Sequence, residues 1–202
     1  MTLLLVRHAL TRQEPGRPVA EWDLDPSGEA AMVALAQLPV WSGTRLFAST
    51  EDKAVRTALA LPGDGPVTRV ADLGEIRRGG WTDDYARRAA DHFIHPMRPS
   101  APGWETADDG FRRFDAAMRR IVAATPGPLA VVSHGLVLTG WLSRIADLDR
   151  TDLDFWRELR FPDAFLLSTE GVARWLGGDT DRRPTVTRVT DAAGVTGGSA
   201  ER

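Results

Sequence analysis

The chain has 202 residues, enough for one domain with a well-formed core, and its 43% hydrophobic and 26% charged residues are ordinary for a globular protein. Its net charge of −3 gives no reason to expect nucleic acid or an anionic membrane as a partner. The absence of cysteine excludes disulfides, thiolate metal sites and cysteine nucleophiles. No apolar run approaches the roughly 18 residues of a membrane span, and we expect a cytoplasmic protein.

Apolar runs and helical patterns alternate along the first half of the chain. Three short runs are typical of strands in a sheet that is buried on both faces, and they cover residues 3–6, 45–48 and 67–71. Two helices are predicted between them. The first is capped by Ser27 and carries an apolar stripe as far as Leu38, and the second covers residues 51–61.

The second half continues the alternation. Its clearest helical pattern covers residues 105–124 and precedes a predicted buried strand at residues 129–132. Shorter helices are predicted at residues 83–93, 136–145 and 151–159. Two apolar runs, residues 164–167 and 172–176, flank Glu170-Gly171 and predict a terminal hairpin.

This alternation predicts an α/β fold, namely a three-layer α/β/α sandwich with a mostly parallel sheet. We expect a single domain over residues 1–178, with a small, mostly helical insertion at about residues 79–125. The polar, glycine-rich stretch 179–202 is predicted to be a flexible C-terminal tail.

Two of the four histidines, His8 and His134, directly follow predicted buried strands. Ligands of open α/β sheets bind outside the carboxyl ends of the strands, so the two imidazoles are expected to meet at one site. A neutral imidazole can attack phosphorus, but the site then needs cations around the phosphoryl oxygens and a carboxyl group for the leaving oxygen. Arg7 supplies one cation, and a helix that starts just after His134 directs its N–H groups to the same place.

Lys53 is the one lysine among 25 basic residues. A strong preference for arginine makes this exception a candidate functional residue. The alternative is a solvated position on a helix, which is the usual environment of a lysine.

Six segments occur in the order and spacing of known motifs. They are Arg7-His8-Ala9, residues 22–28, residues 48–58, residues 73–81, residues 103–106 and Ser133-His134-Gly135. Together they resemble the histidine phosphatase superfamily, which includes cofactor-dependent phosphoglycerate mutases and many small phosphatases, and the resemblance is to its phosphatase branch. Each motif is weak alone, but six in register over about residues 3–175 are specific.

The resemblance implies a role for each matching residue. His8 is the nucleophile and becomes phosphohistidine, while Arg7, Lys53 and His134 hold the phosphoryl oxygens. Glu75 protonates the leaving group and then activates water, although a merely local cap or ion pair is its alternative. The resemblance implies no need for a metal or another cofactor.

Several positions depart from the family pattern or leave a role open. Thr11 stands where the family has Thr or Ser, and it either contacts the phosphate or hydrogen-bonds within its loop. Ala9 replaces a glycine, and Glu14 falls where many relatives carry a phosphate-contacting Asn. Lys53 replaces an arginine, so a point charge stands in place of a bidentate fork. Arg56, one helical turn further on, is a candidate to compensate.

We therefore expect a metal-independent phosphatase that acts on a small phosphorylated metabolite. The alternatives are a phosphoglycerate-type mutase, a phosphoprotein phosphatase and a non-catalytic protein that binds a phosphate ligand. No nucleic acid or membrane is expected as a partner, and the sequence leaves open whether the chain acts alone or as a homodimer.

The predicted insertion contains candidates for binding the organic part of the substrate. These are His92, His95, Arg98 and Trp104. Three tryptophans are expected mainly to pack, with one of them lining the pocket: Trp22, Trp81 and Trp104.

Overall fold

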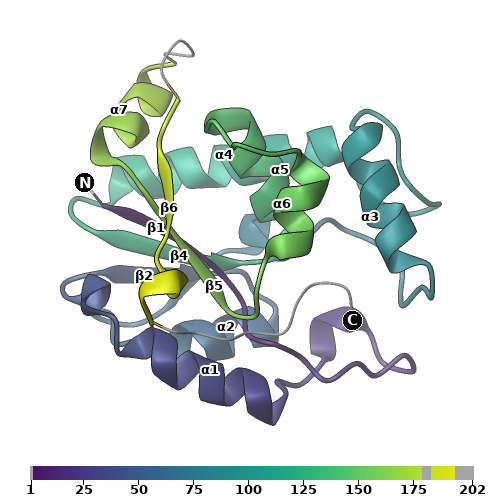
Figure 1. Cartoon of the computed structure of the whole chain (residues 1–202), viewed down its shortest axis with the longest axis horizontal. Coiled ribbons are helices and arrows are strands. Elements are labelled where there is room, and N and C mark those ends of the chain that lie inside the picture. Colours follow the sequence, from purple (N-terminus) through teal and green to yellow (C-terminus); the bar gives the residue numbers. More distant parts are fainter. Residues whose placement is uncertain (1, 179–182, 194–202) are drawn as a thin grey trace.

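One six-stranded sheet forms the centre of the molecule (Figure 1). The structure is a computed structural model, and it describes residues 2–178 and 183–193. The strands are β1 (Leu3–Arg7), β2 (Arg45–Ala48), β3 (Thr68–Arg69), β4 (Leu129–Ser133), β5 (Asp163–Leu167) and β6 (Val186–Arg188). They stand in the order β3-β2-β4-β1-β5-β6. The pairs β1–β4, β2–β4 and β2–β3 are parallel, whereas β5 runs antiparallel to β1 and β6.

Helices cover both faces of this sheet. They are α1 (Pro26–Ala36), α2 (Asp52–Leu59), α3 (Tyr85–Ile94), α4 (Ala107–Ala124), α5 (Gly135–Ile145), α6 (Asp152–Glu158) and α7 (Thr169–Gly177). Helices α1 and α2 lie on one side of the sheet, and α4, α5 and α6 lie on the other (Figure 1). The predicted three-layer α/β fold with a mostly parallel sheet is therefore confirmed.

Strand β1 shows why the sheet needs two covered faces. All five of its residues are buried, and successive side chains of a strand point to opposite faces. Leu3 and Leu5 join the larger core, which contains side chains of α4 and α5. Leu4 and Val6 join the smaller core, to which α2 contributes. A continuous apolar run is thus what a central strand between two helical layers requires.

The parallel strands bring the two histidines to one edge of the sheet. In the pairing of β1 with β4, Arg7 stands opposite Ser133, so the next residues, His8 and His134, leave the sheet side by side. Strand β2 ends at the same edge, with Ala48 opposite Val132. The segment after β2 therefore also leads into this region.

The predicted terminal hairpin is wrong, because residues 172–176 belong to helix α7 and β5 pairs antiparallel with β1 and β6 instead. The Ser168 side chain accepts a hydrogen bond from the Gly171 N–H, and Gly178 ends the helix with a φ of +76°. Val172 and Trp175, three residues apart, are both buried. Residues 183–193 of the predicted flexible tail include β6, which pairs with β5, while the rest of that tail lies outside the described residues.

The start of α1 is a smaller correction. Asp25, rather than Ser27, caps this helix, and its carboxylate accepts hydrogen bonds from both the N–H and the hydroxyl of Ser27. Pro26 then takes the first helical position, where its missing N–H costs nothing.

The region of the predicted insertion contains two helices with different surroundings. Helix α4 packs along α5 in the layer that covers the sheet, whereas α3 packs against α6 further out (Figure 1). Residues 79–86, at the start of this region, contribute to the pocket described below. In the described part of the chain, no helix has both the length and the apolar character needed to cross a membrane.

Candidate active site

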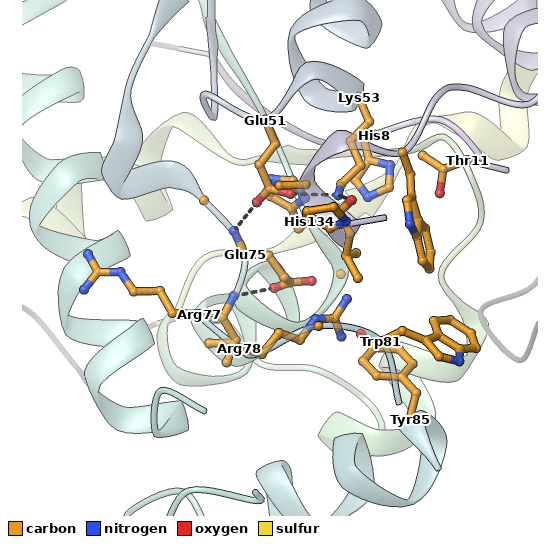
Figure 2. A pocket seen from close by; sticks show the side chains of 18 of the residues that line it. His8, Thr11, Glu51, Lys53, Glu75, Arg77, Arg78, Trp81, Tyr85 and His134 are labelled. Atoms are coloured by element: carbon orange, nitrogen blue, oxygen red, sulfur yellow. Dashed lines mark hydrogen bonds and ion pairs between the residues drawn. The ribbon is translucent and has the colours of Figure 1, made fainter. Parts of the chain in front are cut away.

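A cavity of about 760 Å³ opens at the carboxyl edge of the sheet (Figure 2). All six residues predicted for the site line it: Arg7, His8, Thr11, Lys53, Glu75 and His134. They come from β1, the loop after it, α2, the loop after β3, and the junction of β4 with α5. The structure thus gathers in one cavity residues that are far apart in the sequence.

His8 is held as a neutral imidazole in a defined orientation. Its Nδ1 lies 2.7 Å from the Ala9 carbonyl oxygen, which can only accept a hydrogen bond, so Nδ1 carries the proton and Nε2 carries the lone pair. Burial, and then the nearby His134, Lys53 and Arg7, hold the pKa of His8 well below its usual range. The ring is therefore uncharged at neutral pH and presents one nucleophilic nitrogen.

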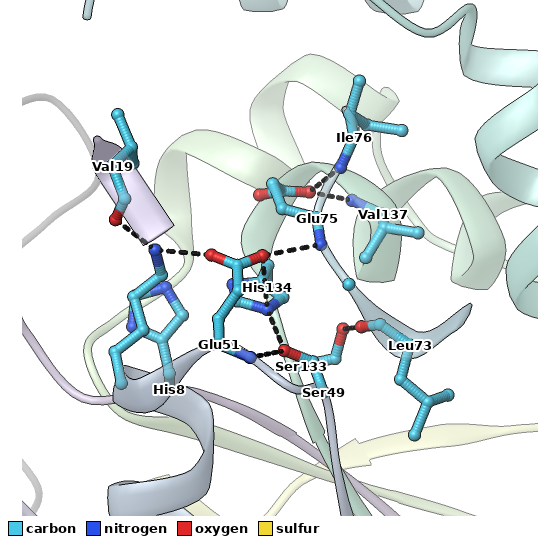
Figure 3. Close-up of polar contacts among 12 residues, drawn as sticks. His8, Val19, Ser49, Glu51, Leu73, Glu75, Ile76, Ser133, His134 and Val137 are labelled. Carbon is cyan, nitrogen blue, oxygen red and sulfur yellow. Dashed lines mark hydrogen bonds and ion pairs between the residues drawn. The ribbon is translucent and has the colours of Figure 1, made fainter. Parts of the chain in front are cut away.

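His134 lies next to His8 at the start of α5, with 5.0 Å between the ring centroids. Its Nε2 is 2.7 Å from the Ser49 hydroxyl oxygen and 3.3 Å from Oε1 of Glu51 (Figure 3). Burial, followed by the charges of Lys53 and Arg78, holds the pKa of His134 well below its usual range. The two histidines thus form a close pair of neutral rings, and the positive charges of Lys53 and Arg7 act on both of them.

Arg7 is positioned by an aromatic ring and a carbonyl group. Its guanidinium lies 3.4 Å from the centroid of the Phe161 ring and donates a hydrogen bond of 2.9 Å to the Leu159 carbonyl. Burial lowers the pKa of Arg7 to about 10, so the side chain stays charged at neutral pH. Gly135 packs against it: a Cβ at that position would lie 3.1 to 3.2 Å from three guanidinium atoms.

Lys53 points into the cavity from α2 and is only 4% exposed, so the solvated alternative is wrong. Its Nζ lies 2.7 Å from Oε2 of Glu51 and donates a hydrogen bond of 2.7 Å to the Val19 carbonyl (Figure 3). Arg56 is exposed, pairs with Glu29 at 2.8 Å and does not line the cavity. It therefore does not compensate for the missing arginine at position 53.

Glu51 is a second carboxylate beside the histidines, and it connects the parts of the site. Its Oε2 pairs with Lys53, while its Oε1 faces His134 and accepts a hydrogen bond of 3.2 Å from the Glu75 N–H. Burial alone raises the pKa of Glu51, but the charge and hydrogen bond of Lys53 outweigh this effect and lower it. Glu51 is consequently ionised at neutral pH.

The Glu75 carboxylate is fixed by backbone N–H groups at the start of α5. Oε1 accepts hydrogen bonds of 2.9 Å from Ile76 and from Val137 (Figure 3). Oε2 accepts one of 3.1 Å from Leu136. Such a carboxylate also interacts favourably with the positive end of the helix dipole. Glu75 therefore caps α5 and also lines the cavity, and its acid–base role stays a prediction.

The loop after His8 contributes Thr11 to the cavity, and its backbone forms a bridge with Leu24. Glu14 does not line the cavity. Its carboxylate pairs with Arg17 at 2.9 Å, and its carbonyl accepts a hydrogen bond from the Trp22 indole. At the position where the resemblance implies a phosphate-contacting side chain, Glu14 instead makes contacts within the loop.

Aromatic side chains form the outer wall of the cavity. Trp22 and Trp81 lie together there with ring centroids 5.4 Å apart, so two of the three tryptophans line it. The four residues predicted to bind the organic part of the substrate do not line it, and that prediction is wrong. Two of the four, His92 and Trp104, are buried side by side. The other two, His95 and Arg98, turn toward Asp91 and also lie outside the cavity lining.

Among the cavity residues that the sequence analysis does not predict are Glu51, Arg78 and Phe161. Signals existed for two of them. Glu51 lies two positions before the single lysine, and Arg78 directly precedes Gly79 in a motif segment. Phe161 carries no such signal, because its place under Arg7 depends on how the loop before β5 returns to the edge of the sheet.

The fold and these residues together define the class of protein. The chain belongs to the histidine phosphatase superfamily (branch 1), whose family model matches residues 3–167. A comparison with curated proteins gave no match.

Solved structures share the fold at low sequence identity. YhfR of Bacillus stearothermophilus is 24% identical, with a TM-score of 0.67, and the match covers 84% of this chain and 92% of that one. A phosphoserine phosphatase mutant from Entamoeba histolytica, in complex with phosphoserine, is 15% identical, with 92% and 94% covered and a TM-score of 0.67. A mycobacterial glucosyl-3-phosphoglycerate phosphatase is 19% identical, with 83% and 89% covered and a TM-score of 0.62.

Proposed function

We propose that this protein is a metal-independent phosphatase that hydrolyses a small phosphate monoester through a phosphohistidine intermediate on His8. The observation that carries the proposal is the state of His8, which is a buried neutral ring with its proton on Nδ1 and its lone pair on Nε2. Arg7 and Lys53 lie around it and supply the positive charge that a transferring phosphoryl group needs.

The first step transfers the phosphoryl group to the enzyme. His8 Nε2 attacks phosphorus, the bond from phosphorus to the ester oxygen breaks, and Glu75, which enters this step in its protonated form, gives its proton to the departing oxygen. In the second step, a water oxygen attacks the phosphohistidine, Glu75 takes a proton from that water, and the bond from Nε2 to phosphorus breaks. Inorganic phosphate leaves and both side chains return to their starting states.

A small phosphorylated metabolite is the substrate that we assign to this site. A cavity of about 760 Å³ is of the size used for small ligands rather than for an extended protein surface. Two of the similar structures are phosphatases by name, which supports hydrolysis over the mutase alternative. A protein that only binds phosphate has no need of an acid–base carboxylate such as Glu75.

The test is phosphate release from a panel of phosphate monoesters in the presence of EDTA. We expect activity in the wild-type protein and its loss by about a thousandfold or more in His8→Ala, because the nucleophile is gone. His95→Ala is the matched control, since His95 is exposed and lies outside the cavity. A His8→Ala protein that keeps near-normal hydrolysis rules out the proposal, as does a wild-type protein that needs an added metal.

A further inference from the structure

Arg78 lies in the cavity but has no role in the chemistry above. Its side chain is partly buried, and among the described residues it has no carboxylate at ion-pair distance, although Glu75 and Glu51 act on its charge from further away. Burial lowers the pKa of Arg78, but Tyr85, Glu75 and Glu51 outweigh burial and raise it, so the side chain keeps a positive charge that no close ion pair occupies. The Arg78 guanidinium is therefore suited to bind an anionic group of the ligand.

Aromatic rings hold the Arg78 guanidinium in place. It lies 4.4 Å from the centroid of the Tyr85 ring and 5.6 Å from that of Trp104. Three other cations of the cavity have protein partners: Lys53 pairs with Glu51 at 2.7 Å, Arg7 binds the Leu159 carbonyl, and Arg113 pairs with Glu105 at 2.7 Å. Arg78 is thus fixed on one side by Tyr85, with which it also shares a side-chain hydrogen bond, while its remaining N–H donors face the cavity.

The direction of the side chain indicates which part of a substrate it meets. Figure 2 shows His8 and Lys53 on one side of Glu75 and the Arg78 guanidinium on the other, near Tyr85 and Trp81. Because Glu75 serves the oxygen that joins the phosphoryl group to the organic group, the organic group extends past Glu75, away from His8. Arg78 therefore faces the leaving alcohol rather than the phosphoryl group.

We propose that Arg78 forms a second anion-binding subsite, and that the substrate carries, besides the phosphoryl group that is removed, a second anionic group on its organic part. A carboxylate and a further phosphate share the chemistry that a guanidinium recognises. The inference rests on the proposed function and narrows its substrate class to phosphate monoesters with a second negative charge.

Three esters with the same three-carbon chain test this subsite: propyl phosphate, 3-phosphonooxypropanoate and propane-1,3-diyl bisphosphate. We expect the wild-type kcat/KM to be about tenfold to a hundredfold higher for at least one of the two anionic esters than for propyl phosphate, the size of one charge-assisted contact. The ester with the higher kcat/KM identifies the group as carboxylate or phosphate.

Arg78→Gln should remove this preference and leave propyl phosphate hydrolysis within about twofold of wild type. Arg78→Lys should restore part of the preference, because it returns the charge, and this distinguishes recognition from a merely structural role. Arg77→Gln is the matched control: Arg77 is the exposed neighbour, and its side chain extends away from the centre of the pocket (Figure 2).

Each contrary outcome has a separate meaning. Equal wild-type rates on all three esters overturn the second subsite while hydrolysis stands. An equal loss on all three esters in Arg78→Gln makes Arg78 a ligand of the phosphoryl group and also overturns it. If none of the three esters is hydrolysed, calorimetric binding of the same esters to the wild-type and Arg78→Gln proteins decides the subsite on its own, while the broader ester panel with His8→Ala decides the proposed function.

Discussion

Glu51 makes the cavity around His8 less positive than its cations alone suggest. Its carboxylate lies 2.7 Å from the Lys53 ammonium and 3.3 Å from His134 Nε2, so it occupies two groups that the proposed reaction needs for phosphoryl oxygens. An incoming phosphate dianion has to share Lys53 with Glu51 and to approach a like charge. Glu51 therefore holds Lys53 in place and at the same time weakens the attraction of the site for phosphate.

Glu51→Gln separates these two effects, because the amide oxygen can still accept a hydrogen bond from Lys53 but the negative charge is gone. We expect the inhibition constant of inorganic phosphate to fall by roughly tenfold, which corresponds to about 1.4 kcal/mol of removed repulsion. Asp52→Asn, on the exposed neighbouring position of α2, is the control and should leave this constant unchanged. Weaker phosphate inhibition in Glu51→Gln would mean that the charge of Glu51 serves binding through Lys53.

For single residues, the sequence predicts a place in the site when the residue directly follows a strand or belongs to a motif of fixed spacing. It does not predict residues whose place depends on tertiary contacts. His8, His134 and Lys53 lie in the cavity because strand ends and the register of a motif segment put them there. His92 was expected to reach a ligand, but its ring packs against Trp104 in the core. Helical spacing places a side chain on a face of its helix, and the neighbouring elements decide whether that face meets a cavity or the core.

Helix α5 joins the two halves of the site, because its first turn binds Glu75 and its first residue makes room for Arg7. Leu136 and Val137 donate their N–H groups to the Glu75 carboxylate. Gly135 lets the Arg7 guanidinium approach the backbone to a distance that a side chain would block. The glycine of the Ser-His-Gly segment is thus explained by packing rather than by a left-handed backbone conformation.

Gly135→Ala should displace the Arg7 guanidinium by a few tenths of an ångström, because the new Cβ would lie 3.1 to 3.2 Å from it. We expect kcat/KM to fall by about tenfold or more, since small displacements of a positioning group are costly in catalysis. Gly140→Ala in the same helix is the control, because a Cβ there meets nothing within 4 Å. Steady-state kinetics and melting temperatures of both variants check this, and an unchanged Gly135→Ala enzyme contradicts the role given to the glycine.

The helices and strands were predicted best where their patterns are long and worst near the end of the described chain. The stripe of α4 extends over 18 residues, and this helix was found with a start only two positions from the predicted one. Helix α7 has nine residues, and its short apolar run suits a strand as well as a helix. The cap at Ser168 and the left-handed backbone conformation of Gly178 mark the two ends of a helix, and the apolar run alone does not show them.

On the scale of the whole molecule, three of the four histidines are buried, which couples folding to pH. His8, His92 and His134 are each 7% exposed or less, and burial is the largest cause of the lowered pKa of all three. Since the unfolded chain binds protons at its ordinary histidine pKa of about 6.5 and the folded chain does not, stability falls as the pH drops below that value.

His92 allows this coupling to be measured away from the active site. Burial lowers its pKa to about 4, so its contribution is lost between about pH 6.5 and pH 4 and amounts to roughly 3 kcal/mol. Urea unfolding at pH 7.5 and pH 4.5 should show a drop in unfolding free energy that is smaller in His92→Gln by about 2 to 3 kcal/mol. His95→Gln, which changes an exposed histidine, should keep the wild-type drop. The same drop in all three proteins contradicts the assignment to His92.

The single lysine also has a consequence for proteolysis. A protease that cuts only after lysine has one target bond in the chain, and the side chain it must bind is 4% exposed and tied to Glu51 and Val19. Cleavage therefore requires α2 to separate from the cavity, and the appearance of two fragments, residues 1–53 and 54–202, measures how often this part of the fold opens. A ligand that binds Lys53 would slow that cut, so digestion becomes a readout of occupancy that needs no turnover.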